Sequence, residues 1–116
     1  MPIRPRSILM AVAFCGGALV AASPALAEDG PTLTLTVKDH KFDQAQPKAV
    51  ANKPFTIIVK NLDQTPMEFE SKSLRVEKII KGGAEASFKI RALAPGKYKF
   101  EDEFHDKTAK GELVVE

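Results

Sequence analysis

The stretch that decides the fold is PGKYKFEDEFHDKTAKGELVV, residues 95–115, which reads as a strand, a charged loop and a closing strand. It opens on a Pro-Gly turn signal. Tyr98, Phe100 and Asp102 then fall on one face of an extended chain, because side chains alternate along a strand. An aspartate therefore continues an aromatic, core-facing stripe, and His105 follows where the strand gives way to the loop.

Upstream of this stretch, short strand-like patterns are separated by turn residues. Residues 32–37 alternate leucine and valine with threonine, and residues 54–60 form a near-continuous apolar run typical of a central strand. Residues 67–70 and 84–90 alternate again, whereas residues 74–80 fit either a strand or a short helix. About six to eight such strands at roughly ten-residue spacing predict an all-β fold, a Greek-key β-sandwich.

Residues 1–27 have the three-part layout of a secretory signal peptide. Two arginines precede an apolar run over residues 8–22, and residues 25–27 form a small-residue cleavage site. The run is shorter than the roughly 20 residues that a membrane span needs. We therefore expect residues 28–116 to form one domain that is exported to the periplasm and is not inserted in the membrane.

The composition of the mature chain excludes several classes of protein. The full sequence has one cysteine, Cys15, which lies in the predicted signal peptide. The mature chain is therefore expected to offer no disulfide and no thiolate ligand. The full chain has 17 basic and 15 acidic residues, and two arginines leave with the signal peptide. The resulting balance gives no indication of a nucleic-acid or anionic-membrane partner. Motifs for nucleophilic catalysis or nucleotide binding are also absent from the sequence.

The charged loop carries the first candidate metal ligands, Asp102, Glu103 and His105. Imidazole and carboxylate groups suit borderline and hard metal ions. The alternative interpretation is a solvated acidic loop. The phase of Asp102 favours a site, because an unpaired charge that faces the core is costly and requires a cation or a basic partner.

A second group of candidates lies on the strand predicted at residues 67–70. Glu68 and Glu70 share one face and Met67 takes the other; the alternatives are a polar outer face for the glutamates and a place in the core for Met67. Two carboxylates converging on His105 would make an oxygen-rich site that prefers iron or manganese over copper(I), with copper(II) left open. Lesser candidates, each with an ordinary structural explanation, are His40, Arg75, Glu77 and Lys110.

The end of the chain resembles that of the cupredoxins, a family of copper-binding β-sandwich proteins. Their pattern Y-x-F-x-C-x-x-H, followed by a strand that begins with glycine, is similar to YKFEDEFH and GELVV in this sequence. The resemblance places Asp102 at the cysteine of the family and His105 at its second histidine. Residues 59–66 resemble the loop that delivers the first histidine, which falls at Met67 or Glu68.

The axial methionine of the cupredoxins falls at Ala109 or Lys110, neither of which is a suitable ligand. Because a blue-copper site needs a cysteine thiolate, the sequence excludes electron transfer by a type 1 copper centre. The departure resembles EfeO-type cupredoxin-like domains and FtrB-like periplasmic proteins, which are associated with high-affinity iron permeases. The shared runs are residues 67–71, 74–78 and 102–105.

This second resemblance implies a periplasmic metal-binding protein that assists iron uptake by binding, delivering or oxidising iron. Iron is the implied metal, with copper, not of type 1, as the alternative. The implied partners are an inner-membrane iron permease and a periplasmic iron-binding protein. The expected metal ligands are Met67, Glu68, Glu70, Asp102, Glu103 and His105.

Two other functions stay open on the sequence. An enzyme-like role in ferrous iron oxidation needs an open coordination position and an electron acceptor, and the sequence identifies no acceptor. A metal-free β-sandwich adaptor, which docks to a membrane permease or a periplasmic partner, would place Glu68, Glu70 and His105 far apart. The separation of these side chains therefore discriminates metal binding from docking.

Overall fold

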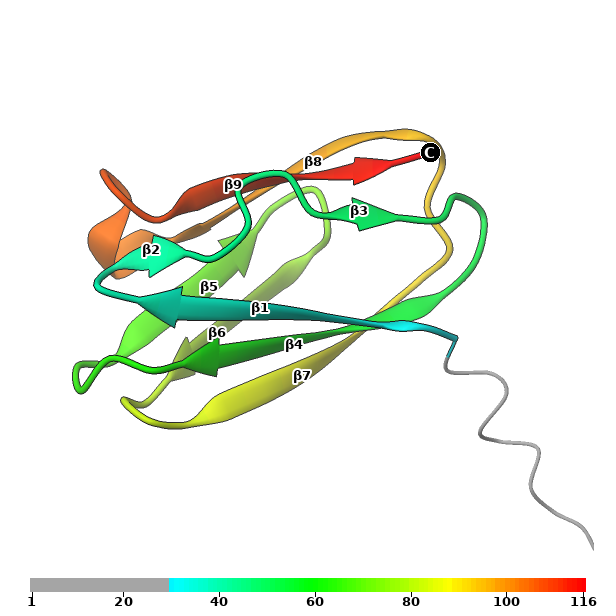
Figure 1. The fold of residues 1–116 in the computed structure, drawn as a ribbon. Coiled ribbons are helices and arrows are strands. Elements are labelled where there is room, and N and C mark those ends of the chain that lie inside the picture. Colours follow the sequence, from blue (N-terminus) through cyan, green and yellow to red (C-terminus); the bar gives the residue numbers. More distant parts are fainter. Residues whose placement is uncertain (1–29) are drawn as a thin grey trace, which may run out of the picture.

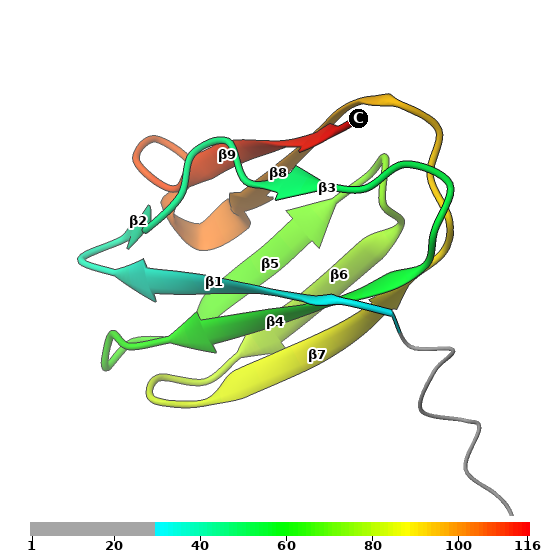
Figure 2. The same cartoon turned by 45° about the vertical axis from the view of Figure 1, so that its right-hand side comes forward.

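The computed structural model describes residues 30–116, which form two β-sheets packed face to face (Figures 1 and 2). The predicted signal peptide and Cys15 lie outside these residues. The four-stranded sheet has the order β2-β1-β4-β7, in which β1 and β4 are parallel and the other neighbours antiparallel. Its strands are β1 (Thr32–Lys38), β2 (Lys41–Phe42), β4 (Phe55–Asn61) and β7 (Glu85–Ile90).

The five-stranded sheet has the order β3-β9-β8-β5-β6, with β3 parallel to β9 and the other neighbours antiparallel. A short 3₁₀ turn, η1, joins β8 to β9 and lies against β5 (Figure 2). The all-β prediction is confirmed, and the ambiguous segment 74–80 ends in an edge strand, β6. The elements are β3 (Lys48–Ala49), β5 (Met67–Ser71), β6 (Val76–Ile80), β8 (Gly96–Asp102), η1 (Glu103–His105) and β9 (Lys110–Val115).

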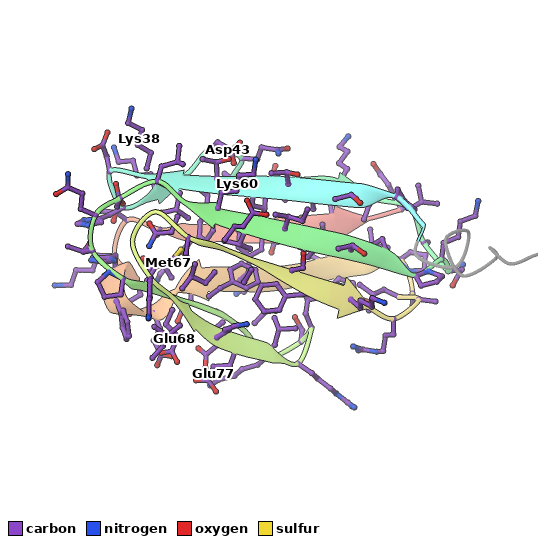
Figure 3. All side chains as sticks on the ribbon, turned by 90° about the horizontal axis from the view of Figure 1, so that it is seen from below. Lys38, Asp43, Lys60, Met67, Glu68 and Glu77 are labelled. Atoms are coloured by element: carbon purple, nitrogen blue, oxygen red, sulfur yellow. The ribbon has the colours of Figure 1, made fainter. Side chains whose placement is uncertain are left out.

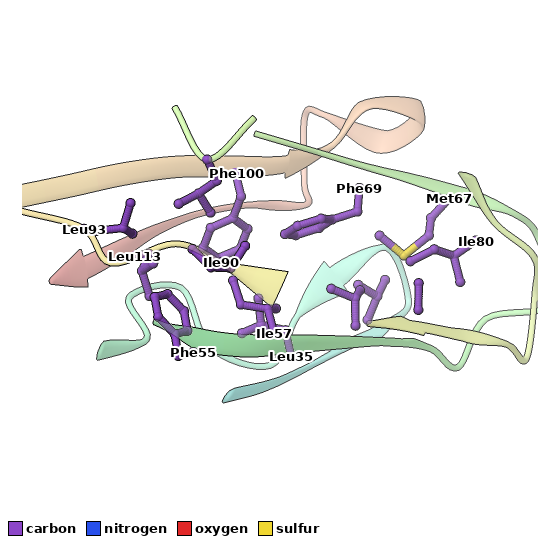
Figure 4. Packing of buried hydrophobic residues seen from close by; sticks show 14 of the residues in the cluster. Leu35, Phe55, Ile57, Met67, Phe69, Ile80, Ile90, Leu93, Phe100 and Leu113 are labelled. Atoms are coloured by element: carbon purple, nitrogen blue, oxygen red, sulfur yellow. The ribbon is translucent and has the colours of Figure 1, made fainter. Parts of the chain in front are cut away.

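The hydrophobic core lies between the two sheets and follows from side-chain alternation (Figure 4). Every second residue of β4 is buried, and on the opposite sheet Phe69 and Phe100 pack with ring centroids 5.7 Å apart. Phe42 closes one side of this cluster with its ring edge-on to Phe100 at 4.9 Å. The inward phase predicted for β8 is confirmed, because Asp102 is fully buried. Within residues 30–116, no helix has the length and apolar character that crossing a membrane requires.

We expect Phe69→Ala to lower the free energy of unfolding by about 3–5 kcal/mol, because it removes a fully buried ring and leaves a cavity between the sheets. Urea unfolding of the mature domain measures this change. Phe104→Ala is the matched control: Phe104 is 48% exposed, and we expect a change of about 0.5 kcal/mol or less. Equal losses in the two variants would contradict this description of the core.

Candidate metal centre

Three glutamates from three elements converge on the outer face of the five-stranded sheet. Glu68 comes from β5, Glu77 from β6 and Glu103 from η1, and one carboxylate oxygen of each lies within 4.8 Å of the other two. Figure 3 shows Glu68 and Glu77 next to each other at the surface of the sandwich. We call these three residues the carboxylate cluster.

The strand register explains why β5 and β6 contribute neighbouring carboxylates. Alternation along β5 turns Met67 inward and Glu68 and Glu70 outward. In the antiparallel pairing with β6, Glu68 lies opposite Ile79 and Glu70 lies opposite Glu77. Glu77 is therefore a diagonal neighbour of Glu68 on the same face, within reach of a long side chain.

η1 brings the third carboxylate to the same place. The β5–β8 ladder reaches the pair Phe69–Asp102, where the chain leaves the strand and enters η1. Glu103, the first residue of η1, therefore lies beside Glu68. The carboxyl groups of Glu68 and Glu103 are close enough to share a proton when one of them is protonated.

The cluster changes the acidity of its own members. The pKa of Glu68 is raised to about 7, and the largest cause is desolvation of its carboxyl group. Hydrogen bonding to Glu103 and to Glu77, and the negative charges of these two residues, raise it further. The pKa of Glu70 is raised as well, by desolvation first and then by the charges of Glu103 and Glu77. Carboxylates held this close favour a shared proton or a cation between them.

Asp102 and His105 form a separate pair, in which the aspartate is buried and the histidine is half-buried. The Oδ2 atom of Asp102 lies 2.6 Å from Nδ1 of His105. The other carboxylate oxygen, Oδ1, accepts hydrogen bonds from the backbone N–H groups of Glu68 and Phe104, both at 3.0 Å. The buried carboxylate thus has the basic partner that its phase along β8 requires, and this partner is an imidazole of the same loop.

A second histidine covers this pair. The ring of His40, from the turn between β1 and β2, stacks on the ring of His105 with centroids 3.6 Å apart and planes at 10°. His40 and Asp39 have left-handed backbone φ angles of 59° and 55°, which residues other than glycine adopt uncommonly. Asp63 holds this turn by accepting the backbone N–H groups of Asp39 at 2.7 Å and of His40 at 2.9 Å.

The contacts with that turn lower the pKa of the Asp63 carboxyl group. Desolvation acts to raise its pKa, but the N–H donors of His40 and Asp39 and the charges of the two histidines outweigh it and hold the pKa of Asp63 below its ordinary value. Thr108 adds a bond from the opposite loop, since its hydroxyl donates to the His40 carbonyl at 2.6 Å. The two stacked imidazoles are therefore fixed from both sides.

The structure divides the predicted ligands into groups. It brings Glu68 and Glu103 together with Glu77, which the sequence offered only as a lesser candidate because the strand β6 was not assigned. Glu70 lies next to this cluster on the same face. Met67 is 1% exposed and packs in the core (Figure 4), so it does not reach the cluster. Asp102 and His105 bond to each other, and metal binding by any of the six predicted ligands remains a prediction.

Comparison with known protein families identifies the fold. The Cupredoxin-like domain family matches residues 9–115. The chain belongs to this family. A curated relative, an uncharacterized protein of Rickettsia prowazekii (strain Madrid E), is 36% identical over 81 residues, which are 70% of this chain and 65% of that protein.

Solved structures of the same fold include auracyanin A, a "blue" copper protein from Chloroflexus aurantiacus. It matches this cupredoxin-like chain with a TM-score of 0.63 and 17% identity, over 75% of this chain and 100% of that one. The metal binding domain of the Cu(I) exporting P-type ATPase CopA of Streptococcus pneumoniae D39, solved with Cu(I), matches with a TM-score of 0.66 and 15% identity, over 77% of this chain and 89% of that one. At these identities the likeness shows the fold alone.

The side chains of this cupredoxin-like domain do not fit a type 1 copper centre. Such a centre needs a cysteine thiolate, and the corresponding position holds Asp102, whose two oxygens already accept hydrogen bonds. Met67, one of the two positions for the first histidine, lies in the core. Ala109, one of the two positions for the axial methionine, is buried and has no donor atom in its side chain. The oxygen donors that converge are those of the carboxylate cluster.

We expect the stability of the domain to fall as the pH rises from about 4.5 to about 7, because the folded protein retains a proton on Glu68 that the unfolded chain has lost. The stabilisation is complete below the ordinary pKa of 4.5 and is lost as the pH passes the folded-state value of about 7. Urea midpoints at pH 5 and pH 8 measure the fall, which should be smaller in Glu68→Gln. Glu85→Gln, an exposed glutamate of β7, is the control, and an undiminished fall in Glu68→Gln would contradict the prediction.

Proposed function

We propose that this cupredoxin-like domain binds iron as cargo at the carboxylate cluster and assists a high-affinity iron permease from the periplasm. The observation that carries the proposal is the convergence of Glu68, Glu77 and Glu103 within 4.8 Å. Carboxylate oxygens suit hard cations, and side chains on three different elements offer ligands from three directions. The cluster is exposed at Glu77 and Glu103, so an ion and a partner protein have access to it.

The electrostatics support a cation at this position. Desolvation first, and then the neighbouring Glu103 and Glu77, raise the pKa of Glu68 and so disfavour its charged form. A cation removes the repulsion that a proton otherwise relieves. Because ligands must lose their protons to bind a metal, the affinity should increase as the pH rises through 7.

The donor set supports a hard ion over copper(I). Copper is the metal named for auracyanin A and for the CopA domain, but residues 30–116 contain no cysteine to supply the thiolate that a blue-copper site requires. A set of carboxylate oxygens suits hard ions, iron and manganese among them, better than copper(I), and the titration with Cu(II) tests the remaining oxidation state of copper. The resemblance to EfeO-type and FtrB-like proteins selects iron over manganese, and with the predicted signal peptide it supports a role in iron uptake with an inner-membrane permease and a periplasmic iron-binding protein as partners.

We expect the mature domain to bind Fe(II) at one site, and Glu77→Gln to weaken this binding about tenfold or more, because the variant removes one of three anionic ligands. Anaerobic titration calorimetry with Fe(II), and in parallel with Mn(II) and Cu(II), measures the affinities. Glu85→Gln removes the same charge from the other sheet and should leave the affinity unchanged.

Two results would overturn this function. Equal weakening in Glu77→Gln and Glu85→Gln would show that only the net charge matters and that the cluster is not the site. Absence of heat with all three ions would reject metal binding and favour the metal-free adaptor. The exposed Phe104 and Ile79 would then be the first residues to test as docking contacts, because both lie beside Glu103 or Glu68.

A further inference from the structure

We propose that Asp102 is a positioning residue for the carboxylate cluster and not one of its metal ligands. Its buried carboxylate ties β5 at Glu68 to η1 at Phe104 and thereby fixes the separation of Glu68 and Glu103. This inference rests on the proposed function, since it assigns a role to Asp102 at the same cation site.

One oxygen atom joins the two backbone segments that carry cluster residues. Oδ1 of Asp102 accepts the N–H of Glu68 and the N–H of Phe104, each at 3.0 Å. The first donor belongs to a cluster residue, and the second belongs to the residue that follows Glu103. Any movement of η1 relative to β5 must therefore lengthen at least one of these bonds.

The side chain of Asp102 replaces a missing partner in the sheet. The β5–β8 ladder includes the pair Phe69–Asp102, and the next residue of β8 would pair with Glu68 if the strand continued. The chain turns into η1 at that point, which would leave the N–H of Glu68 without its ladder acceptor. The Asp102 carboxylate accepts this N–H and also caps the first turn of η1.

The other carboxylate oxygen of Asp102 is hydrogen-bonded as well. Its side chain is fully buried, and Oδ2 bonds to Nδ1 of His105 at 2.6 Å. Asp102 faces the core, whereas alternation turns Glu68 to the outer face of the sheet. A cation bound among the outward carboxylates would therefore lie on the opposite side of the sheet from the Asp102 side chain.

The third member of the cluster is held independently. Glu77 takes its position from the β5–β6 ladder, which does not involve Asp102. Loss of the Asp102 bonds should therefore leave Glu68 and Glu77 together and release Glu103. Outer groups that orient metal ligands typically contribute about 10–100-fold to metal affinity.

The test compares Asp102→Asn with Asp102→Ala in Fe(II) and Mn(II) titrations of the mature domain. Asparagine keeps the oxygen that accepts both N–H groups but cannot act as a carboxylate ligand, so we expect an affinity within about threefold of the wild type. Alanine removes the clamp, and we expect a loss of about 10–100-fold. Equal large losses in both variants, or an unchanged affinity in Asp102→Ala, would overturn the proposal.

Ser71→Ala separates positioning from a general loss of stability. Ser71 is also buried and also links β5 to β8, since its hydroxyl donates to the Lys99 carbonyl at 2.6 Å, but it lies outside the cluster. We expect this variant to be less stable and to bind the ions as the wild type does. If Asp102→Ala does not fold, Asp102→Glu takes its place: a longer carboxylate would preserve a ligand but displace η1, so it should lose affinity only if Asp102 is a clamp.

Amide hydrogen exchange in the metal-free protein decides the clamp independently of the proposed function. The amides of Glu68 and Phe104 should be protected in the wild type and in Asp102→Asn and should exchange faster in Asp102→Ala. This pattern with no ion bound to the wild type would reject iron binding and retain the clamp. Unchanged exchange at both amides in Asp102→Ala would reject the clamp whatever the titrations show.

Discussion

A buried carboxylate at the junction of β5, β8 and η1 determines much of the local structure. A negative charge in a protein core is costly unless hydrogen bonds replace its hydration. Asp102 receives two backbone N–H groups on one oxygen and the imidazole of His105 on the other. These bonds end the β5–β8 ladder at a defined residue and begin η1 directly after it. The direction of the loop, and with it the position of Glu103, follows from this junction.

Most strands could be predicted from the sequence because each has one face in the core. The alternation of Tyr98, Phe100 and Asp102 also predicted correctly that the aspartate is buried. Residues 74–80 could not be assigned, because they contain a turn and then an edge strand with an exposed, outward Ile79. A strand of this kind lacks the usual alternation, and only its pairing with β5 defines it.

The candidate site could be predicted in part, and the rest depends on long-range geometry. Carboxylates on a short strand and in a charged loop indicated Glu68 and Glu103, but the contribution of Glu77 depends on a register that the sequence does not specify. The stack of His40 on His105 joins two loops from distant parts of the chain, and neither loop carries a local signal for it. The spacing of Asp102 and His105 fits a mutual hydrogen bond as well as a shared metal, so chemistry alone could not separate the two.

An enclosed metal site and an exposed carboxylate cluster have different consequences for a bound ion. A structural metal site is closed by a full set of protein ligands and retains its ion. The carboxylate cluster lies on the outer face of a sheet, with Glu77 and Glu103 exposed and Glu68 able to take up a proton near pH 7. Protons therefore compete with the ion over the range in which the cluster titrates, and a partner can approach the ion from solvent. On the proposed function, exposure and proton competition both favour release of the ion, which a delivery protein requires and an enclosed centre between the sheets would prevent.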